Sequence, residues 1–89
     1  MHWERYIKDF VSYLKIERGL AENSILAYQR DVLLLAQYFE GAKSKPEQIS
    51  YDQLKTFIAH LYDLGLSARS QARIISGIKQ FYGFLLLEN

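Results

Sequence analysis

The polar side chains best suited to chemistry lie between residues 67 and 79, where serine and basic residues recur with no acidic residue among them. Arg69 and Arg73 are four residues apart, so on a helix they share one face, and Ser70 lies beside them. Guanidinium groups match phosphate or guanine, and a serine hydroxyl can bond to either backbone or base. The pattern favours a helix that lies in or across a DNA groove. A solvated basic face is the alternative that charge alone leaves open.

A second polar cluster begins at Asn23 and Ser24, which offer a helix N-cap, and continues with Ala27 and Tyr28. The amide groups of a helix N-terminus favour phosphate, and small side chains permit close approach. A functional interpretation therefore makes this turn a phosphate-positioning device. The structural alternative treats Ser24 only as a cap and Tyr28 as a core aromatic residue whose hydroxyl reaches the surface.

The sequence holds no constellation that predicts catalysis. Without cysteine there are no disulfides or thiolate ligands, and His2 and His60 are the only imidazoles. His60 has at best a local partner in Asp63, one turn later, and we expect it at the core edge or in solvent. Glycine-rich phosphate loops and paired-histidine zinc motifs are missing. We expect no catalytic residue, no metal, no cofactor and no small-molecule substrate.

Apolar residues recur at helical spacing in four segments, each bounded by capping residues or glycine. The segments run from His2 to about Arg18, from Asn23-Ser24 to Gly41, from Ser50 to Gly65, and from Ser67 to the end of the chain. Residues 41–46 read as a loop, and no segment alternates as a strand would. We therefore expect an all-α, compact four-helix domain of orthogonal or bundle-like packing. Gly77 and Gly83 weaken the last helix by about 1 kcal/mol each, which close packing would explain.

Size and charge set further bounds. Eighty-nine residues suffice for one domain with one core, and a formal net charge of +1 is too small to indicate nucleic-acid binding by itself. No apolar run approaches the roughly 20 residues of a membrane span, and the N-terminus has no signal-peptide pattern. We expect a cytoplasmic protein without a membrane partner.

Two segments carry a family pattern, residues 17–32 in and before the second expected helix and residues 66–85 in the last one. Together they resemble the Xer-type tyrosine recombinases of the phage-integrase family. Residues 17–32, ERGLAENSILAYQRDV, are similar to that family's pattern E-(K/R)-x-L-(A/S)-x-N-T-x-x-x-Y-x-x-D-(L/I), with Ser24 where threonine is usual. Residues 66–85, LSARSQARIISGIKQFYGFL, resemble its fourth core-binding helix. The order and spacing of the segments also agree, and the resemblance spans nearly the whole chain.

The resemblance implies that residues 1–89 are an N-terminal SAM-like core-binding domain, which forms a clamp around one DNA half-site together with a separate catalytic domain. The catalytic arginines, histidines and nucleophilic tyrosine belong to that C-terminal domain, which would follow Asn89, so none of the 7 tyrosines here inherits the nucleophile's role. The implied partners are double-stranded DNA and other recombinase subunits, which form a tetramer on paired sites. By position, the implied DNA contacts are Asn23, Ser24, Ala27, Tyr28, Ser67, Arg69, Ser70, Arg73, Gly77 and Lys79.

Other interpretations remain open on the sequence. A helical protein-interaction module of SAM or death-domain type would use the basic last helix to dock an acidic partner. A helix-turn-helix regulator ranks third, because the segment after Ser67 is too long and too apolar for a recognition helix. Trp3, Tyr6 and Tyr13 are candidates for contact with a neighbouring subunit, although the spacing of Trp3 favours the core.

Overall fold

The computed structural model describes residues 2–40 and 44–88. In chain order the elements are α1 (His2–Ile16), α2 (Glu22–Tyr38), the 3-10 helix η2 (Pro46–Gln48), α3 (Tyr51–Asp63) and α4 (Ala68–Glu88). The described residues include no strand, which confirms the all-α prediction. None of their helices is both long and apolar enough to span a membrane.

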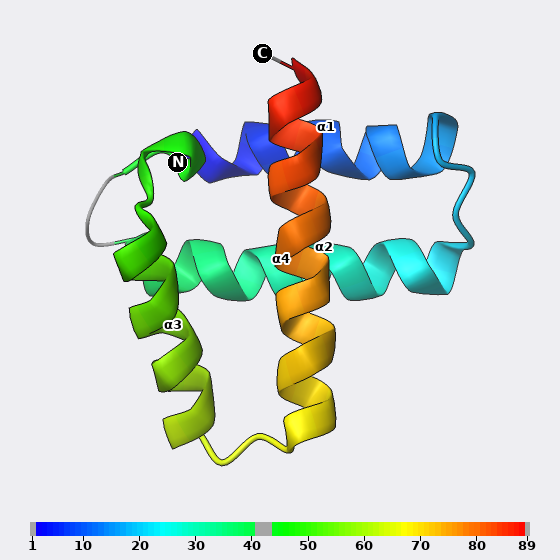
Figure 1. The fold of residues 1–89 in the computed structure, drawn as a ribbon. Helices are drawn as coiled ribbons and strands as arrows, with labels where there is room; N and C mark the ends of the chain where they lie inside the picture. Colours follow the sequence, from blue (N-terminus) through cyan, green and yellow to red (C-terminus); the bar gives the residue numbers. More distant parts are fainter. Residues whose placement is uncertain (1, 41–43, 89) are drawn as a thin grey trace.

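The helices form two crossed layers. α1 and α2 run side by side in opposite directions, and α4 passes across both of them, with α3 beside α4 (Figure 1). This crossing of helix pairs is the orthogonal arrangement expected for a SAM-like domain. It brings the middle of α2 against the N-terminal half of α4 (Figure 1), so polar residues far apart in sequence meet there.

The core lies where the layers cross, and every α-helix contributes to it. Phe10, Phe57 and Phe81 are almost fully buried, and the ring of Phe10 meets that of Phe81 edge-on at 5.3 Å between centroids. Burial of aromatic side chains of this size contributes a large share of the hydrophobic free energy of folding. The predicted apolar stripes therefore face inward, as helical periodicity requires.

Trp3 is a core residue, with 2% of its surface exposed. Its ring stacks on Phe81, and its indole N–H donates to the backbone carbonyl of Ser44 at 2.9 Å. Tyr6 and Tyr13 are half-buried and pack against the same core, and the Tyr6 hydroxyl donates to the Glu47 carboxylate at 2.8 Å. The core interpretation of Trp3 is thus confirmed.

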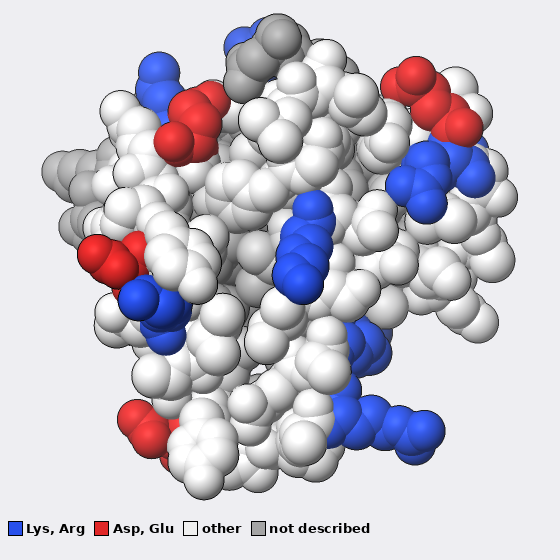
Figure 2. Space-filling view, in the orientation of Figure 1, with Lys and Arg blue, Asp and Glu red and all other residues white. Residues whose placement is uncertain are grey.

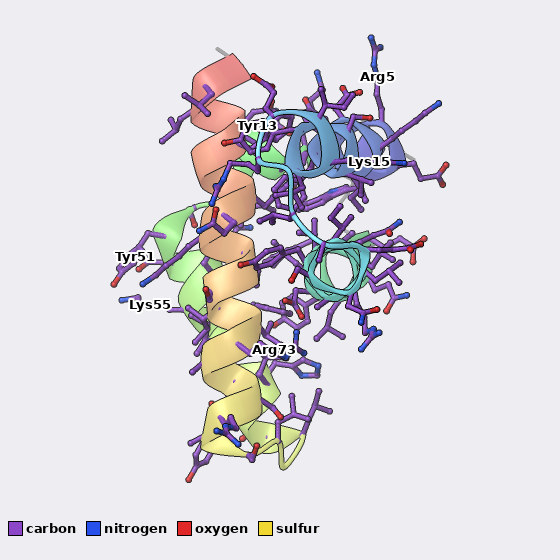
Figure 3. The ribbon with its side chains drawn as sticks, turned by 90° about the vertical axis from the view of Figure 1, so that its right-hand side faces the viewer. Arg5, Tyr13, Lys15, Tyr51, Lys55 and Arg73 are labelled. Carbon is purple, nitrogen blue, oxygen red and sulfur yellow. The ribbon has the colours of Figure 1, made fainter. Side chains whose placement is uncertain are left out.

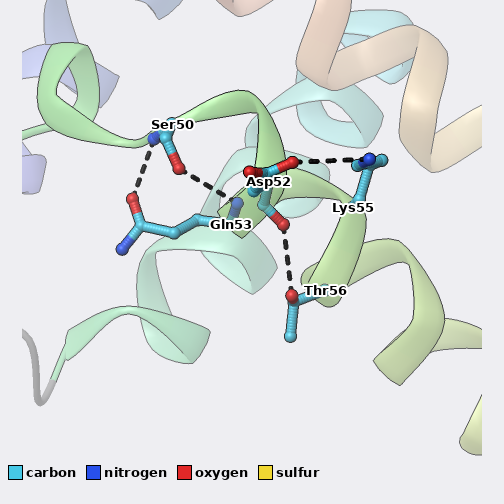
Figure 4. Close-up of polar contacts among 5 residues, drawn as sticks. All are labelled: Ser50, Asp52, Gln53, Lys55 and Thr56. Atoms are coloured by element: carbon cyan, nitrogen blue, oxygen red, sulfur yellow. Dashed lines mark hydrogen bonds and ion pairs between the residues drawn. The ribbon is translucent and has the colours of Figure 1, made fainter.

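Several helix ends form where local sequence predicts them. Ser50 and Gln53 make the reciprocal capping box at the start of α3, with bonds of 2.8 and 3.1 Å (Figure 4). Ser67 caps α4, because its Oγ accepts the Ser70 N–H at 3.1 Å. Gly19 and Gly65 have φ angles of 59° and 78°, in the left-handed region that suits glycine after a helix.

The predicted boundaries of α2 are wrong. The helix begins at Glu22, and its N-cap residue, Ala21, makes no side-chain capping bond. Ser24 therefore lies inside the first turn and does not cap the helix. Just before the helix, Leu20 packs on the core, and its N–H donates to the Leu14 carbonyl at 3.1 Å. This contact fixes the chain before the helix begins. At its other end α2 stops at Tyr38, while the predicted limit, Gly41, lies outside the described residues.

Two further expectations change. α1 ends at Ile16, two residues before the expected limit, and part of the predicted loop is the 3-10 helix at Pro46–Gln48. Close packing explains only one glycine of α4: Gly77 lies against Asp31, whereas a β-carbon at Gly83 would meet nothing within 4 Å. The latter glycine has no packing reason in the fold.

Candidate nucleic-acid interface

An ion pair joins α2 to α4 at their crossing. Arg73 Nη1 donates to both carboxylate oxygens of Asp31, at 2.9 and 3.1 Å. The Asp31 side chain is only 2% exposed, whereas that of Arg73 is 48% exposed. The buried carboxylate therefore holds one nitrogen of the guanidinium of a side chain that is about half exposed to solvent.

Gly77 provides the space for this carboxylate. It lies one helical turn beyond Arg73, and a β-carbon built on it would overlap Oδ2 of Asp31. The sequence resemblance suggested Gly77 as a DNA contact, but in the fold this residue is buried. Its lack of a side chain is explained by an intramolecular contact.

Burial dominates the electrostatics of Asp31. Desolvation raises the pKa of the Asp31 carboxyl above its usual range, although the neighbouring Arg73 charge and hydrogen bonds act in the opposite direction. An ionised carboxylate at this depth is costly unless it is paired. The stability of the fold alone therefore does not explain why an aspartate stands at position 31.

Two of the predicted α2 residues, Ser24 and Ala27, lie on the side of the helix that carries Asp31. Ser24, Ala27 and Asp31 are spaced at i, i+3 and i+7, which places them on one helix face. Because Asp31 contacts Arg73, this face borders α4. Ser24 and Asn23 are exposed, and Ala27 and Tyr28 are half-buried, with Tyr28 packed on the core as its structural interpretation predicted.

The predicted polar residues of α4 lie near the same crossing. Arg69 is exposed, one turn before Arg73, and takes part in no salt bridge among the residues described. Ser70 is half-buried, and its hydroxyl accepts a 3.1 Å bond from Ser67. Arg69 and Arg73, four residues apart, therefore lie on one side of α4, and Arg73 contacts α2 through Asp31.

Lys79 lies apart from the two arginines. With about 100° of rotation per residue, it is about 80° around α4 from Arg69 and about 120° from Arg73. It lines an apolar groove between α3 and α4 with Tyr51 and Lys55. Figure 3 shows Arg73 on the side of α4 toward α2 and those two α3 residues on the other side.

Surface charge is separated in the same way. Figure 2 shows basic side chains without acidic neighbours beside the lower half of α4, the half that carries Arg69 and Arg73. Elsewhere on this face, most basic groups have acidic ones close by. The sequence asymmetry of α4 thus becomes a local basic surface in the fold.

Sequence reasoning missed the role of Asp31. Asp31 directly precedes the apolar run from Val32 to Ala36, and an acidic residue buried with such a run needs a partner. That signal was available. The identity of the partner was not, because Arg73 is 42 positions away.

His60 is exposed and its ring lies 4.9 Å from that of Tyr38, in agreement with the expected place at the core edge or in solvent. In the described part of the chain no three histidine or acidic residues are grouped so as to hold a metal ion.

Comparison with known proteins identifies the family. The family model of the phage integrase N-terminal SAM-like domain matches residues 7–89. The chain therefore belongs to this family of helical domains.

Similar curated proteins are tyrosine recombinases named XerD. That of Rickettsia bellii is 39% identical over 84 residues, covering 94% of this chain and 28% of the relative. Those of Chlorobaculum tepidum and Staphylococcus epidermidis are 34% and 37% identical over 86 and 83 residues, covering 97% and 92% of the chain. The chain spans about 28% of the length of these relatives. No solved structure gives a significant match.

Proposed function

We propose that this chain is the DNA-binding, core-binding domain of a site-specific tyrosine recombinase, which grips one recombination half-site while a separate C-terminal catalytic domain performs strand exchange. The names of the similar proteins support the parent activity, and the match of residues 7–89 supports the place of this domain within it. In this proposal residues 1–89 contribute no catalytic residue. Further recombinase subunits assemble with the parent protein as a tetramer on paired sites.

The observation that carries the proposal is the basic edge at the α2–α4 crossing. Arg69 and the half-exposed Arg73 lie on the same side of α4, and the α2 face that carries Ser24 and Asp31 borders α4. Double-stranded DNA presents phosphates on either side of a groove that an α-helix can enter. The predicted DNA contacts in this region are Asn23, Ser24, Ala27, Tyr28, Ser67, Arg69, Ser70 and Arg73. Lys79 and the buried Gly77 are weaker candidates because of where they lie.

The test is a fluorescence-anisotropy titration of a labelled duplex of mixed sequence at about 50 mM and about 200 mM salt, the range over which phosphate contacts lose affinity. Arg69→Gln removes an exposed charge from the proposed interface, and Lys8→Gln removes one from the exposed side of α1. We expect weaker binding and a slope of log K against log salt about 0.9 smaller for Arg69→Gln, and no change for Lys8→Gln.

Arg69 is the better first variant, because replacing Arg73 by a neutral residue leaves Asp31 buried without its cation. Absence of binding by the unaltered chain at low salt, or equal loss in both variants, contradicts the proposal. The protein-interaction module with a basic docking helix then becomes the better account.

A further inference from the structure

We infer that Asp31 is a positioning residue for DNA binding: it fixes the guanidinium of Arg73 at the edge of the α2–α4 crossing, so that the free side of that group is already oriented toward a phosphate or base. This inference rests on the proposed function. It assigns to a buried acidic residue a role in binding a polyanion, which its charge alone would oppose.

Geometry is the first support. Both Asp31 oxygens accept from Nη1 of Arg73, and among the described residues Nη2 and Nε have no hydrogen-bond partner. A guanidinium has five donors in a rigid planar fork, so anchoring Nη1 orients the other donors. The Arg73 side chain is about half exposed, so a ligand can approach it.

The second support is that the arrangement has a cost which core packing does not explain. A well-packed apolar residue at a helix crossing is often at least as stabilising as a buried ion pair. Here Asp31 is buried to 2% exposure, and Gly77 in the middle of α4 is needed to accommodate it. Two residues that each weaken the fold locally are thus combined at one point, and what they achieve is the fixed orientation of one arginine.

Order in the free protein lowers the entropy lost on binding. Immobilising a flexible side chain at an interface reduces affinity by about 2- to 12-fold, which an already ordered arginine avoids. Asp31→Asn keeps the size of the side chain but removes its charge, and one end of the amide donates where the carboxylate accepted. We therefore expect this variant to bind DNA about 2- to 12-fold more weakly.

The sign of this change separates positioning from simple charge. Removing a negative charge near DNA strengthens binding if only Coulomb attraction matters. The matched control is Glu22→Gln in the first turn of α2, which removes an exposed acidic charge away from Arg73. It is expected to bind the same duplex equally or more tightly.

The experiment measures anisotropy with the mixed-sequence duplex for the unaltered 89-residue chain, Asp31→Asn, Glu22→Gln, Arg73→Gln and the double variant Asp31→Asn/Arg73→Gln. Circular dichroism establishes that each is folded at the titration temperature. We expect Asp31→Asn to weaken binding in the presence of Arg73 and to have no weakening effect when Arg73 is replaced. If Arg73→Gln does not fold, Arg73→Lys takes its place, because it keeps a cation opposite Asp31.

A second measurement needs no DNA. Relaxation of the isotope-labelled Arg73 Nε–H group by NMR should report a rigid side chain in the unaltered chain and a mobile one in Asp31→Asn. A rigid Arg73 in both, or Asp31→Asn binding DNA as tightly as the unaltered chain, overturns the role of Asp31 and leaves the proposed function intact. Failure of the unaltered chain to bind overturns both.

Discussion

Gly77 on α4 lies directly against the carboxylate of Asp31 on α2. That carboxylate fills the space that a β-carbon would occupy if position 77 held any other residue. The contact sets how closely the two helices approach. It also allows the buried acid to reach Arg73. A test of this packing is therefore a test of the crossing itself.

We expect Gly77→Ala to destabilise the fold. The new methyl group must displace a buried, ion-paired side chain, which costs about 1–3 kcal/mol, against about 1 kcal/mol gained in helix propensity. Gly83→Ala is the matched control, because no neighbouring atom lies within 4 Å of the added carbon. That variant should be more stable by up to about 1 kcal/mol. Urea unfolding measures both, and a stabilised Gly77→Ala chain would refute the assigned contact.

Stability should depend on pH through Asp31. Because burial raises the pKa of this carboxyl in the folded state above its ordinary value of 3.8, the folded chain binds the proton more tightly than the unfolded chain. The resulting contribution to stability is fully present below pH 3.8 and is lost as pH rises through the raised pKa. Unfolding free energies of the unaltered chain, minus those of Asp31→Asn, should fall from acid toward neutral pH. A difference that rises over this range contradicts the assignment.

The capping box of α3 gives a local prediction. Ser50→Ala removes the Oγ that accepts the Gln53 N–H, and we expect a loss of about 0.5–2 kcal/mol. Ser12→Ala changes the same residue type at an exposed position in the middle of α1. Alanine is the better helix former there, so the stability should be unchanged or slightly higher. Thermal unfolding followed by circular dichroism compares the two, and equal effects would argue against the cap.

Tyr82 ties α4 to the start of η2. Its hydroxyl donates to the Pro46 carbonyl at 2.7 Å, and Tyr82→Phe should cost about 0.5–1.5 kcal/mol in chemical unfolding. Tyr62→Phe, at a side chain 73% exposed, should leave stability unchanged. Burial also raises the pKa of the Tyr82 phenol well above its ordinary value of 10.0, so it should ionise after the exposed tyrosines in an alkaline absorbance titration. Early ionisation of Tyr82 would show that the hydroxyl is not buried.

Short-range features of this protein were determined by the sequence itself. The Ser50–Gln53 box and the left-handed Gly65 depend on residues at most a turn apart, so local hydrogen bonding and backbone sterics are enough to specify them. Helical periodicity likewise placed Trp3 and Phe81 in a core, because a 3.6-residue repeat defines the buried face whatever the partner. The two motif segments also predicted the family that the comparisons show.

The tertiary structure decided what depends on contacts between distant segments. Local capping preference predicted that α2 begins at Ser24, but the helix begins at Glu22. Leu20, just before this start, packs on the core. Only the crossing of α2 and α4 gave Asp31 its partner and placed Gly77 against the carboxylate of Asp31. Only the packing of α3 on α4 placed Lys79 beside Tyr51 and Lys55. Pairings of this kind are set by how whole helices cross, a choice made by the sum of the buried contacts, which no local pattern of residues contains.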